Sequence, residues 1–184
     1  MKTVIKQVGI DYSMTGPSVC LITNTDEVYI YTICKTKKYQ GEYEHKNFKI
    51  NIGEYPKAFD HQIERFKWIS EYFINILMEY VYDKDCVWNI EGYSMGSKGK
   101  VFHIAENTAI LKRDLSKSGI YPNEIAPTTV KKSATDKGNS AKEAMETAFV
   151  RQTGFALSEL IDCKFGGAPA NDMVDSYFIA RYIL

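Results

Sequence analysis

Four carboxylates stand where this sequence would ordinarily place apolar or turn residues. Asp11 closes an apolar run in VGIDYS, and Glu91 closes another in VWNIEGYS. Asp172 and Asp175 lie three residues apart in ANDMVDS, a spacing that places both on one face of a helix. A buried carboxylate loses its hydration and needs a partner or a cation. If the four converge, they form an anionic pocket suited to magnesium or manganese, which prefer hard oxygen ligands.

Taken singly, three of these carboxylates have an ordinary structural alternative. Asp11 could cap a turn, and Glu91 could be a solvated residue that leaves its strand. Asp172 could interact favourably with the dipole at the first turn of a helix. Asp175 lies beside an apolar stripe and is harder to explain in this way, so the argument rests on the set of four.

The first third of the chain has the pattern of a β-meander. β-branched and aromatic runs predict strands over Val4–Asp11, Ser18–Thr23 and Val28–Cys34, with turn-forming residues between them. Residues 35–60 are polar and punctuated by glycine, which indicates a long excursion or a β-hairpin extension. Asp11 is therefore expected at the end of the first strand.

The pattern changes after residue 57, where apolar residues recur at steps of three and four. Short apolar runs and terminating glycines mark the elements that follow. The expected order is a helix over residues 58–82, a strand over 86–90 that ends at Glu91, a glycine-rich loop over 92–99, a helix over 101–118 and a weak strand over 121–125.

The last third is expected to be helical. Pro127 opens a short basic segment that is helical or irregular. Ser140 is expected to cap a further helix, with Glu143 completing a capping box. The final helix is expected over residues 170–184. Together these elements predict one α/β domain over residues 1–184 with a mixed sheet.

Composition excludes several classes of protein. Of 184 residues, 45% are apolar and 25% are charged, which excludes a fully disordered or collagen-like chain. Because 23 basic residues balance 23 acidic ones, net charge does not indicate a nucleic-acid partner. Cys20, Cys34, Cys86 and Cys163 lack zinc-site spacing and are expected to be buried thiols in a reducing compartment. We expect a cytoplasmic protein, or one in the host cytoplasm if the gene is viral, with no membrane partner.

Local charge points to phosphate more clearly than net charge does. Between Ser94 and Lys142, nine basic side chains stand against four acidic ones. Such a patch could neutralise phosphates and release counterions, although an ordinary solvated helix face is the alternative. Tyr93 and Met95 could wedge between bases or simply pack the loop.

The order of four motifs resembles the RuvC family of Holliday-junction resolvases, within the ribonuclease-H-like superfamily. The motifs are GIDYS, IEGYS, PTTVKK with DKGNSAKE, and NDMVDSYFIA, in blocks over residues 3–34 and 86–184. The resemblance implies an α/β fold with a ribonuclease-H-like, mixed five-stranded sheet flanked by helices. It also implies two magnesium ions per site, for which manganese can substitute, held by Asp11, Glu91, Asp172 and Asp175.

The same resemblance implies how the protein acts on DNA. Lys131 and Lys142 match a pair of family lysines that serve catalysis or phosphate binding. The implied partners are branched DNA, chiefly four-way junctions, and a second copy of the chain, with the helix over residues 101–118 at the dimer interface. The residues expected to contact DNA are Tyr93, Ser94, Met95, Lys98, Lys100, Lys132 and Lys137.

The sequence departs from the family pattern at several positions. Tyr12 and Ser13 stand where the family usually has Pro-Gly, and the glycine pair of the basic loop is only half kept, as Asp136 and Gly138. Ser94 stands where some members carry an aromatic residue. These changes bear on substrate and sequence preference more than on metal chemistry.

Three alternatives remain at this stage. The chain could be a nuclease of other branched DNA or of RNA–DNA hybrids, or a junction-binding protein that has lost catalysis. An actin-like ATPase module shares the opening strand with its aspartate, but a second glycine-rich phosphate loop is lacking and the chain is too short for two lobes.

Overall fold

The computed structural model describes residues 4–56, 58–93 and 101–183, the side chain of Val101 excepted. The first three strands are confirmed at the predicted bounds: β1 Val4–Asp11, β2 Ser18–Thr23 and β3 Val28–Cys34. They form an antiparallel meander in which Asp11 pairs with Ser18. Every residue of β2 is buried, which fits a strand covered on both faces of the sheet.

The polar segment after β3 builds the edge of the sheet. It contains a short 3-10 helix η1 (Lys37–Tyr39) and the antiparallel hairpin of β4 (Gly41–His45) and β5 (Phe48–Glu54), with β5 parallel to β3. The hairpin alternative is thus confirmed. The expected five-stranded sheet is wrong, because this hairpin adds two strands and gives seven in the order β4-β5-β3-β2-β1-β6-β7.

The middle of the chain supplies a helix pair and two more strands. They are α1 Gln62–Met78, β6 Val81–Glu91, α2 Val101–Ser116 and β7 Asn123–Ile125. The helix predicted over residues 58–82 is shorter at both ends. At its C-terminal end this is because Val81 and Tyr82 pair with Val4 and Ile5 in the sheet.

The C-terminal part contains α3 Pro127–Thr135, α4 Lys142–Thr153, the short α5 Leu157–Leu160 and α6 Ala170–Arg181. The predicted capping box is wrong. Ala141 occupies the N-cap of α4 and no side chain caps it. The Ser140 hydroxyl instead donates to the Lys137 carbonyl oxygen at 2.8 Å, closing the turn before the helix.

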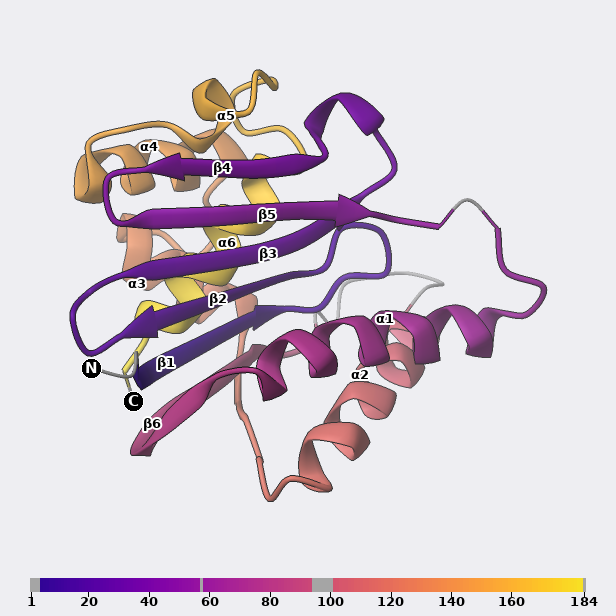
Figure 1. The fold of residues 1–184 in the computed structure, drawn as a ribbon. Coiled ribbons are helices and arrows are strands. Elements are labelled where there is room, and N and C mark those ends of the chain that lie inside the picture. Colours follow the sequence, from indigo (N-terminus) through magenta and orange to yellow (C-terminus); the bar gives the residue numbers. More distant parts are fainter. Residues whose placement is uncertain (1–3, 57, 94–100, 184) are drawn as a thin grey trace.

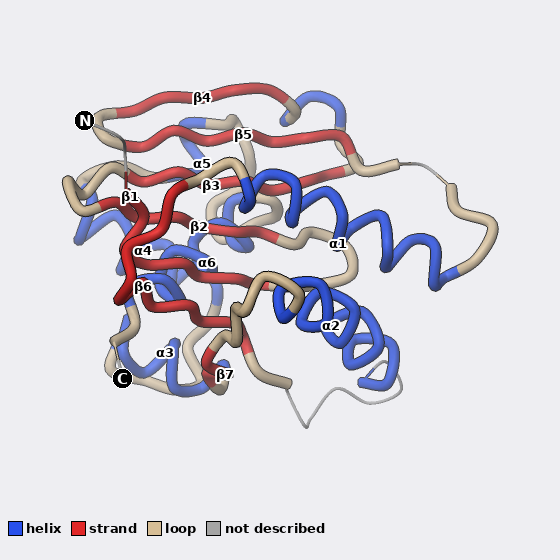
Figure 2. Tube along the Cα trace, turned by 60° about the horizontal axis from the view of Figure 1, so that its bottom comes forward, coloured by secondary structure: helices blue, strands red, loops and turns tan. Residues whose placement is uncertain are grey.

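Helices cover both faces of the sheet (Figure 1). One buried cluster joins α1 and α2 to one face, and a second joins α3, α4, α5 and α6 to the other. Helices α1 and α2 lie side by side (Figure 2). Nine residues of α6 are buried, so this helix is a central element of the second layer.

The strand directions bring several strand ends to one edge of the sheet. Strands β1, β3, β5, β6 and β7 all run parallel to one another. Their carboxyl ends therefore lie along one edge. Asp11 and Glu91 are the last residues of two adjacent strands there.

The state of the four cysteines agrees in part with expectation. All four cysteines are unpaired, Cys20 and Cys34 being buried, whereas Cys86 and Cys163 are only half-buried. In the described ranges, we find no helix that combines the length and the apolar character needed to cross a bilayer.

Candidate metal centre

Two carboxylates leave the sheet from neighbouring strand ends. Ile10 pairs with Ile90 across the parallel strands β1 and β6, so Asp11 and Glu91 follow side by side. Asp11 is buried and Glu91 is half-buried. Both line a cavity of about 290 Å³, together with residues 12–15, Gly92 and Tyr93.

The other two carboxylates come from α6, one turn apart, and the helix is joined to the same strand ends. Ser176, which follows Asp175, shares a hydrogen bond of 3.0 Å with Ser18, and both hydroxyls are buried. Ser18 is the register partner of Asp11. This contact holds the middle of α6 against the start of β2, beside the end of β1.

The loop after β1 packs directly on Asp172. A β-carbon added to Gly16 would lie 2.4 Å from Asp172 Oδ2, so only glycine allows this approach. The Asn171 side-chain amide donates to Asp172 Oδ1 at 2.7 Å. Asp172 is therefore held from two sides.

The charges of the four carboxylates affect one another. Burial raises the pKa of Asp11 well above its ordinary value, and Glu91, Asp175 and Asp172 raise it further. Burial, then Glu91 and Asp172, raise the pKa of Asp175 to about 7, while burial raises that of Asp172 to about 6. The pKa of Glu91 is raised by burial and by Asp172. Such repulsion between like charges requires short separations.

Two lysines oppose this negative charge. Lys142, the first residue of α4, lowers the pKa of Asp11 and Asp172, and Lys131 in α3 lowers that of Glu91. All six residues that the sequence singled out as catalytic thus influence one another through their charges. Two ammonium groups cannot neutralise four ionised carboxylates. A bound cation would supply the missing positive charge.

The donor set fits a hard divalent cation. It consists of carboxylate oxygens, the ligands that magnesium and manganese prefer. Among the described residues, no three carboxylate, histidine or cysteine side chains are gathered closely enough to form a ready-made ion site.

The residues expected to contact DNA are only partly placed. Tyr93 is half-buried in the cavity wall, with the Lys112 ammonium 5.0 Å from its ring centroid, a contact typical of loop packing. Lys132 and Lys137 are exposed, Lys132 next to Lys131 in α3 and Lys137 in the segment between α3 and α4. The remaining four, Ser94, Met95, Lys98 and Lys100, lie outside the described residues.

The basic patch is smaller than its sequence suggests. Lys112 pairs with Glu124 at 2.6 Å, and Arg113 and Lys117 both pair with Asp114 at 2.8 Å. Three cations thus share two carboxylates, which leaves one of the three positive charges uncompensated within the protein. The positive charge near the carboxylates comes from α3 and the start of α4.

Sequence reasoning missed the residues that hold the loop after Asp11. The Arg65 guanidinium and the Tyr55 hydroxyl both donate to the Met14 carbonyl oxygen, the latter at 2.9 Å. These partners lie 41 and 51 residues from Met14, so no local pattern could have indicated them. The glycine at position 16 was the one local sign of a tight approach.

Comparisons with known proteins find relatives by structure alone. No protein-family model matches the sequence, and no curated protein matches it. A Thermus thermophilus RuvC structure has a TM-score of 0.53 at 13% identity, covering 94% of this chain and 89% of that one. A T. thermophilus RuvC in complex with a Holliday junction substrate has a TM-score of 0.57 at 15% identity, covering 95% and 90%. The yeast mitochondrial Holliday junction resolvase Ydc2 has a TM-score of 0.57 at 16% identity, covering 98% and 78%.

These likenesses define the class of fold. The chain has the mixed α/β, ribonuclease-H-like fold of the RuvC-type resolvases, as the resemblance of its motifs implies. At identities of 13–16%, the likeness extends to the fold, and the chemistry rests on the site itself.

Proposed function

We propose that this chain is a divalent-metal-dependent endonuclease that cuts branched DNA, chiefly four-way junctions, by phosphodiester hydrolysis. One observation carries the proposal: carboxylates from β1, β6 and α6 meet beside two lysines at one edge of the sheet. The fold supports it, since one structural neighbour is a RuvC in complex with a Holliday junction substrate.

Within this proposal, Asp11, Glu91, Asp172 and Asp175 would hold two magnesium ions, with manganese as a substitute. Bound ions of this kind supply an activated water and stabilise charge on the phosphate and the leaving oxygen. Asp11 is central, since its charge interacts with the three other carboxylates.

The two lysines have distinct places in this scheme. Lys142 is exposed at the start of α4, and its charge lowers the pKa of Asp11 and of Asp172. Its ammonium group can therefore donate a hydrogen bond to an oxygen of a phosphate that reaches the carboxylates. Lys131 faces Glu91. Either ammonium can stabilise negative charge that develops on the phosphate during attack.

A four-way junction is cut at two symmetric positions, so we propose a two-fold homodimer. Helix α2 is the proposed interface, and it carries an apolar side chain in solvent: Phe102 is 77% exposed. Such a side chain is a natural contact for a second copy. The molar mass in solution, measured for wild type and Phe102→Ser, tests this assembly.

The test of the function is a cleavage assay. Synthetic four-way junctions are incubated with the protein and magnesium, beside forked DNA, RNA–DNA hybrid and linear duplex at equal concentration. We expect paired, symmetric nicks in the junction, lost in Asp11→Asn and in EDTA. Junction cleavage by folded Asp11→Asn at the wild-type rate would remove the proposed metal site.

A junction-binding protein without catalysis is the second candidate, favoured by the lack of a ready-made ion site among the described residues. Such a protein would bind four-way junctions tightly and would produce no nicks in the presence of magnesium or of manganese. Cleavage of the forked DNA or of the RNA–DNA hybrid, in place of the junction, would identify a nuclease of other branched DNA or of hybrids.

We propose that the protein acts in the cytoplasm, or in the host cytoplasm if the gene is viral. Its four unpaired thiols support this proposal.

A further inference from the structure

The sheet edge that carries Asp11 continues on its other side through β3 and β5. Strand β3 ends at Cys34 and is followed by Lys35, and β5 ends at Glu54 and is followed by Tyr55. Only β2 separates β1 from β3. With strands about 4.8 Å apart, these two strand ends lie roughly 10 and 14 Å from the end of β1.

Tyr55 holds two cations at this place. The Lys35 ammonium lies 5.4 Å from the centroid of its ring, and the Arg65 guanidinium carbon also lies 5.4 Å from it. The tyrosine is buried, whereas Lys35 is exposed and Arg65 is half-buried. Within the part of the chain that the structure describes, neither cation has a carboxylate oxygen within 4 Å.

Two cavities lie beside these cations, and one of them is also lined by Asp172. One, of about 340 Å³, is lined by Lys35, Tyr55, His61 and Arg65 among others. The other, of about 260 Å³, is lined by Lys35 and Asp172. Lys35 lines both cavities, so this one residue lies between the space beside Asp172 and the space beside Arg65.

The same arginine also contacts the loop of the candidate metal centre. It donates to the carbonyl oxygen of Met14, which lies in the wall of the cavity that contains Asp11 and Glu91. Arg65 lies in the first turn of α1, which begins after His61, where the helix dipole adds positive potential and Glu64 is the acidic neighbour. A phosphate bound at Arg65 would therefore lie close to the metal-binding loop.

We propose that Lys35 and Arg65, arranged by Tyr55, form a second phosphate-binding surface for the DNA strand that leaves the carboxylates on the β3 side. This inference rests on the proposed function. Lys131 and Lys142 flank the carboxylates from α3 and α4, so the strand would cross the sheet edge between two groups of cations. A separation of about 10–14 Å corresponds to about three or four nucleotide steps of 3.4 Å.

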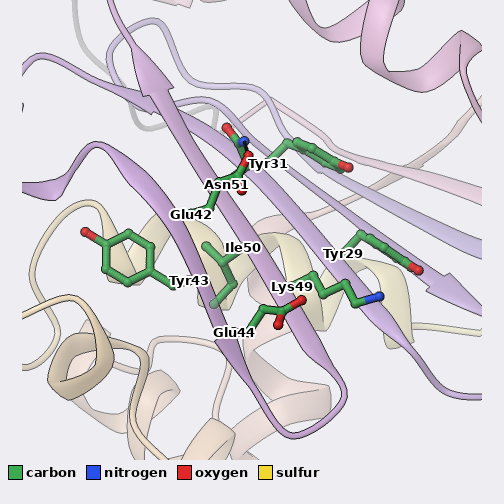
Figure 3. Close-up of a pocket in the computed structure, with 8 residues that line it drawn as sticks. All are labelled: Tyr29, Tyr31, Glu42, Tyr43, Glu44, Lys49, Ile50 and Asn51. Atoms are coloured by element: carbon green, nitrogen blue, oxygen red, sulfur yellow. Dashed lines mark hydrogen bonds between the residues drawn. The ribbon is translucent and has the colours of Figure 1, made fainter.

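A second lysine provides a matched control. Lys49 lies 5.3 Å from the ring centroid of Tyr29, in a hollow of about 470 Å³ on the open face of β3, β5 and β4 (Figure 3). Glu42 and Glu44 line the same hollow, so its charge does not favour phosphate. Lys49→Glu therefore reverses the charge of a lysine that also lies over a tyrosine ring, but within β5 and away from the sheet edge that carries Asp11.

The experiment measures the dissociation constant of a four-way junction in EDTA over a range of salt, for wild type, Lys35→Glu, Lys35→Ala and Lys49→Glu. We expect Lys35→Glu to weaken binding about tenfold and to reduce the slope of log affinity against log salt by about one. Lys35→Ala should show a smaller change in the same direction and guards against misfolding of the reversal. Lys49→Glu should stay within about twofold of wild type.

The outcomes separate this inference from the proposed function. Equal affinities and slopes for Lys35→Glu and Lys49→Glu, with wild type cutting junctions, overturn the second surface and leave the function standing. Weaker binding by Lys35→Glu alone, with no cleavage by wild type, supports the surface and removes the nuclease. If wild type binds none of the DNA substrates, both proposals are wrong.

Discussion

Gly9 in β1 and Ser176 in α6 are in such close contact that a β-carbon at position 9 would lie 2.2 Å from the Ser176 carbonyl oxygen. The same atom would lie 2.2 Å from the Ala180 backbone nitrogen. Because both neighbours are backbone atoms, no side-chain rotation can relieve the clash. Asp11 follows two residues after this contact and Asp175 immediately precedes it, so it sets how closely the two carboxylates approach.

Replacing Gly9 by alanine should push α6 away from the sheet. We expect Gly9→Ala to lower the free energy of unfolding by about 2–3 kcal/mol, the usual cost of overpacking a tight interior. Urea unfolding measures this cost. Gly119→Ala is the control, since its β-carbon would meet no atom within 4 Å and adds only the strain of a positive φ, about 1 kcal/mol. Equal losses in both variants would argue against the close contact.

Gly16→Ala should displace Asp172, whose Oδ2 would lie 2.4 Å from the new β-carbon. Because the side chain can move where backbone cannot, we expect a folded protein with a distorted carboxylate set. Changes beside metal ligands typically cost about 10- to 100-fold in metal affinity or activity, so cleavage should fall in that range. Junction binding in EDTA should be unchanged. Undiminished cleavage would show that Asp172 is not held by this loop.

Asp175 should make the metal-free protein less stable at higher pH. Its pKa is about 7 in the folded chain and 3.8 ordinarily, so the folded state binds more protons between these values. Stability from this group is therefore present below about pH 4 and lost as the pH rises through about 7. In EDTA, Asp175→Asn should match wild type near pH 4 and exceed its thermal midpoint at pH 8. A variant equally stable or less stable at pH 8 would contradict the crowding of carboxylates.

Asp114 should have the opposite dependence on pH. Burial alone would raise its pKa, but hydrogen bonds from Lys117, Ser70 and Arg113 outweigh this and lower it to about 2. Its stabilising effect is therefore present above about pH 4 and lost as the pH falls towards 2. Ser70 in α1 donates to Asp114 in α2 at 2.8 Å, and this charge-assisted bond joins the two helices.

The bond between α1 and α2 can be measured through its donor. Ser70→Ala should cost about 1.5–3 kcal/mol of unfolding free energy at pH 7, the range for hydrogen bonds to charged groups. Urea titrations at pH 7 and pH 2.5 give the comparison, with a smaller loss expected at the lower pH. A loss that does not change with pH would mean that the bond does not depend on the charge of Asp114.

The predictions from sequence were correct where buried apolar residues recur at the spacing of a strand or a helix. The strands that end at Asp11 and Glu91 are apolar runs closed by an acid, and the parallel order of β1 and β6 then brings those acids together. The i, i+3 spacing of Asp172 and Asp175 likewise follows from helical geometry, and both residues lie on α6. These features are local in sequence, so they could be predicted.

The predictions from sequence were wrong or incomplete where the structure depends on contacts between residues distant in sequence, or where acidic side chains pair with basic ones. The expected count of five strands was wrong because the hairpin of β4 and β5 pairs with β3 and extends the sheet. The basic charges of α2 looked available for DNA, but Asp114 and Glu124 pair with them. Nothing in the local pattern connects Arg65 to Met14, because that contact exists only after α1 has packed beside the loop.

The central claim is that the four carboxylates bind a pair of divalent cations. Titration of the purified protein with manganese, followed by calorimetry and by the electron paramagnetic resonance of free Mn²⁺, tests it most directly. We expect two ions per chain for wild type and a loss of both strong sites in Asp11→Asn. If folded wild type binds no more manganese than Asp11→Asn does, the carboxylates do not form a metal centre.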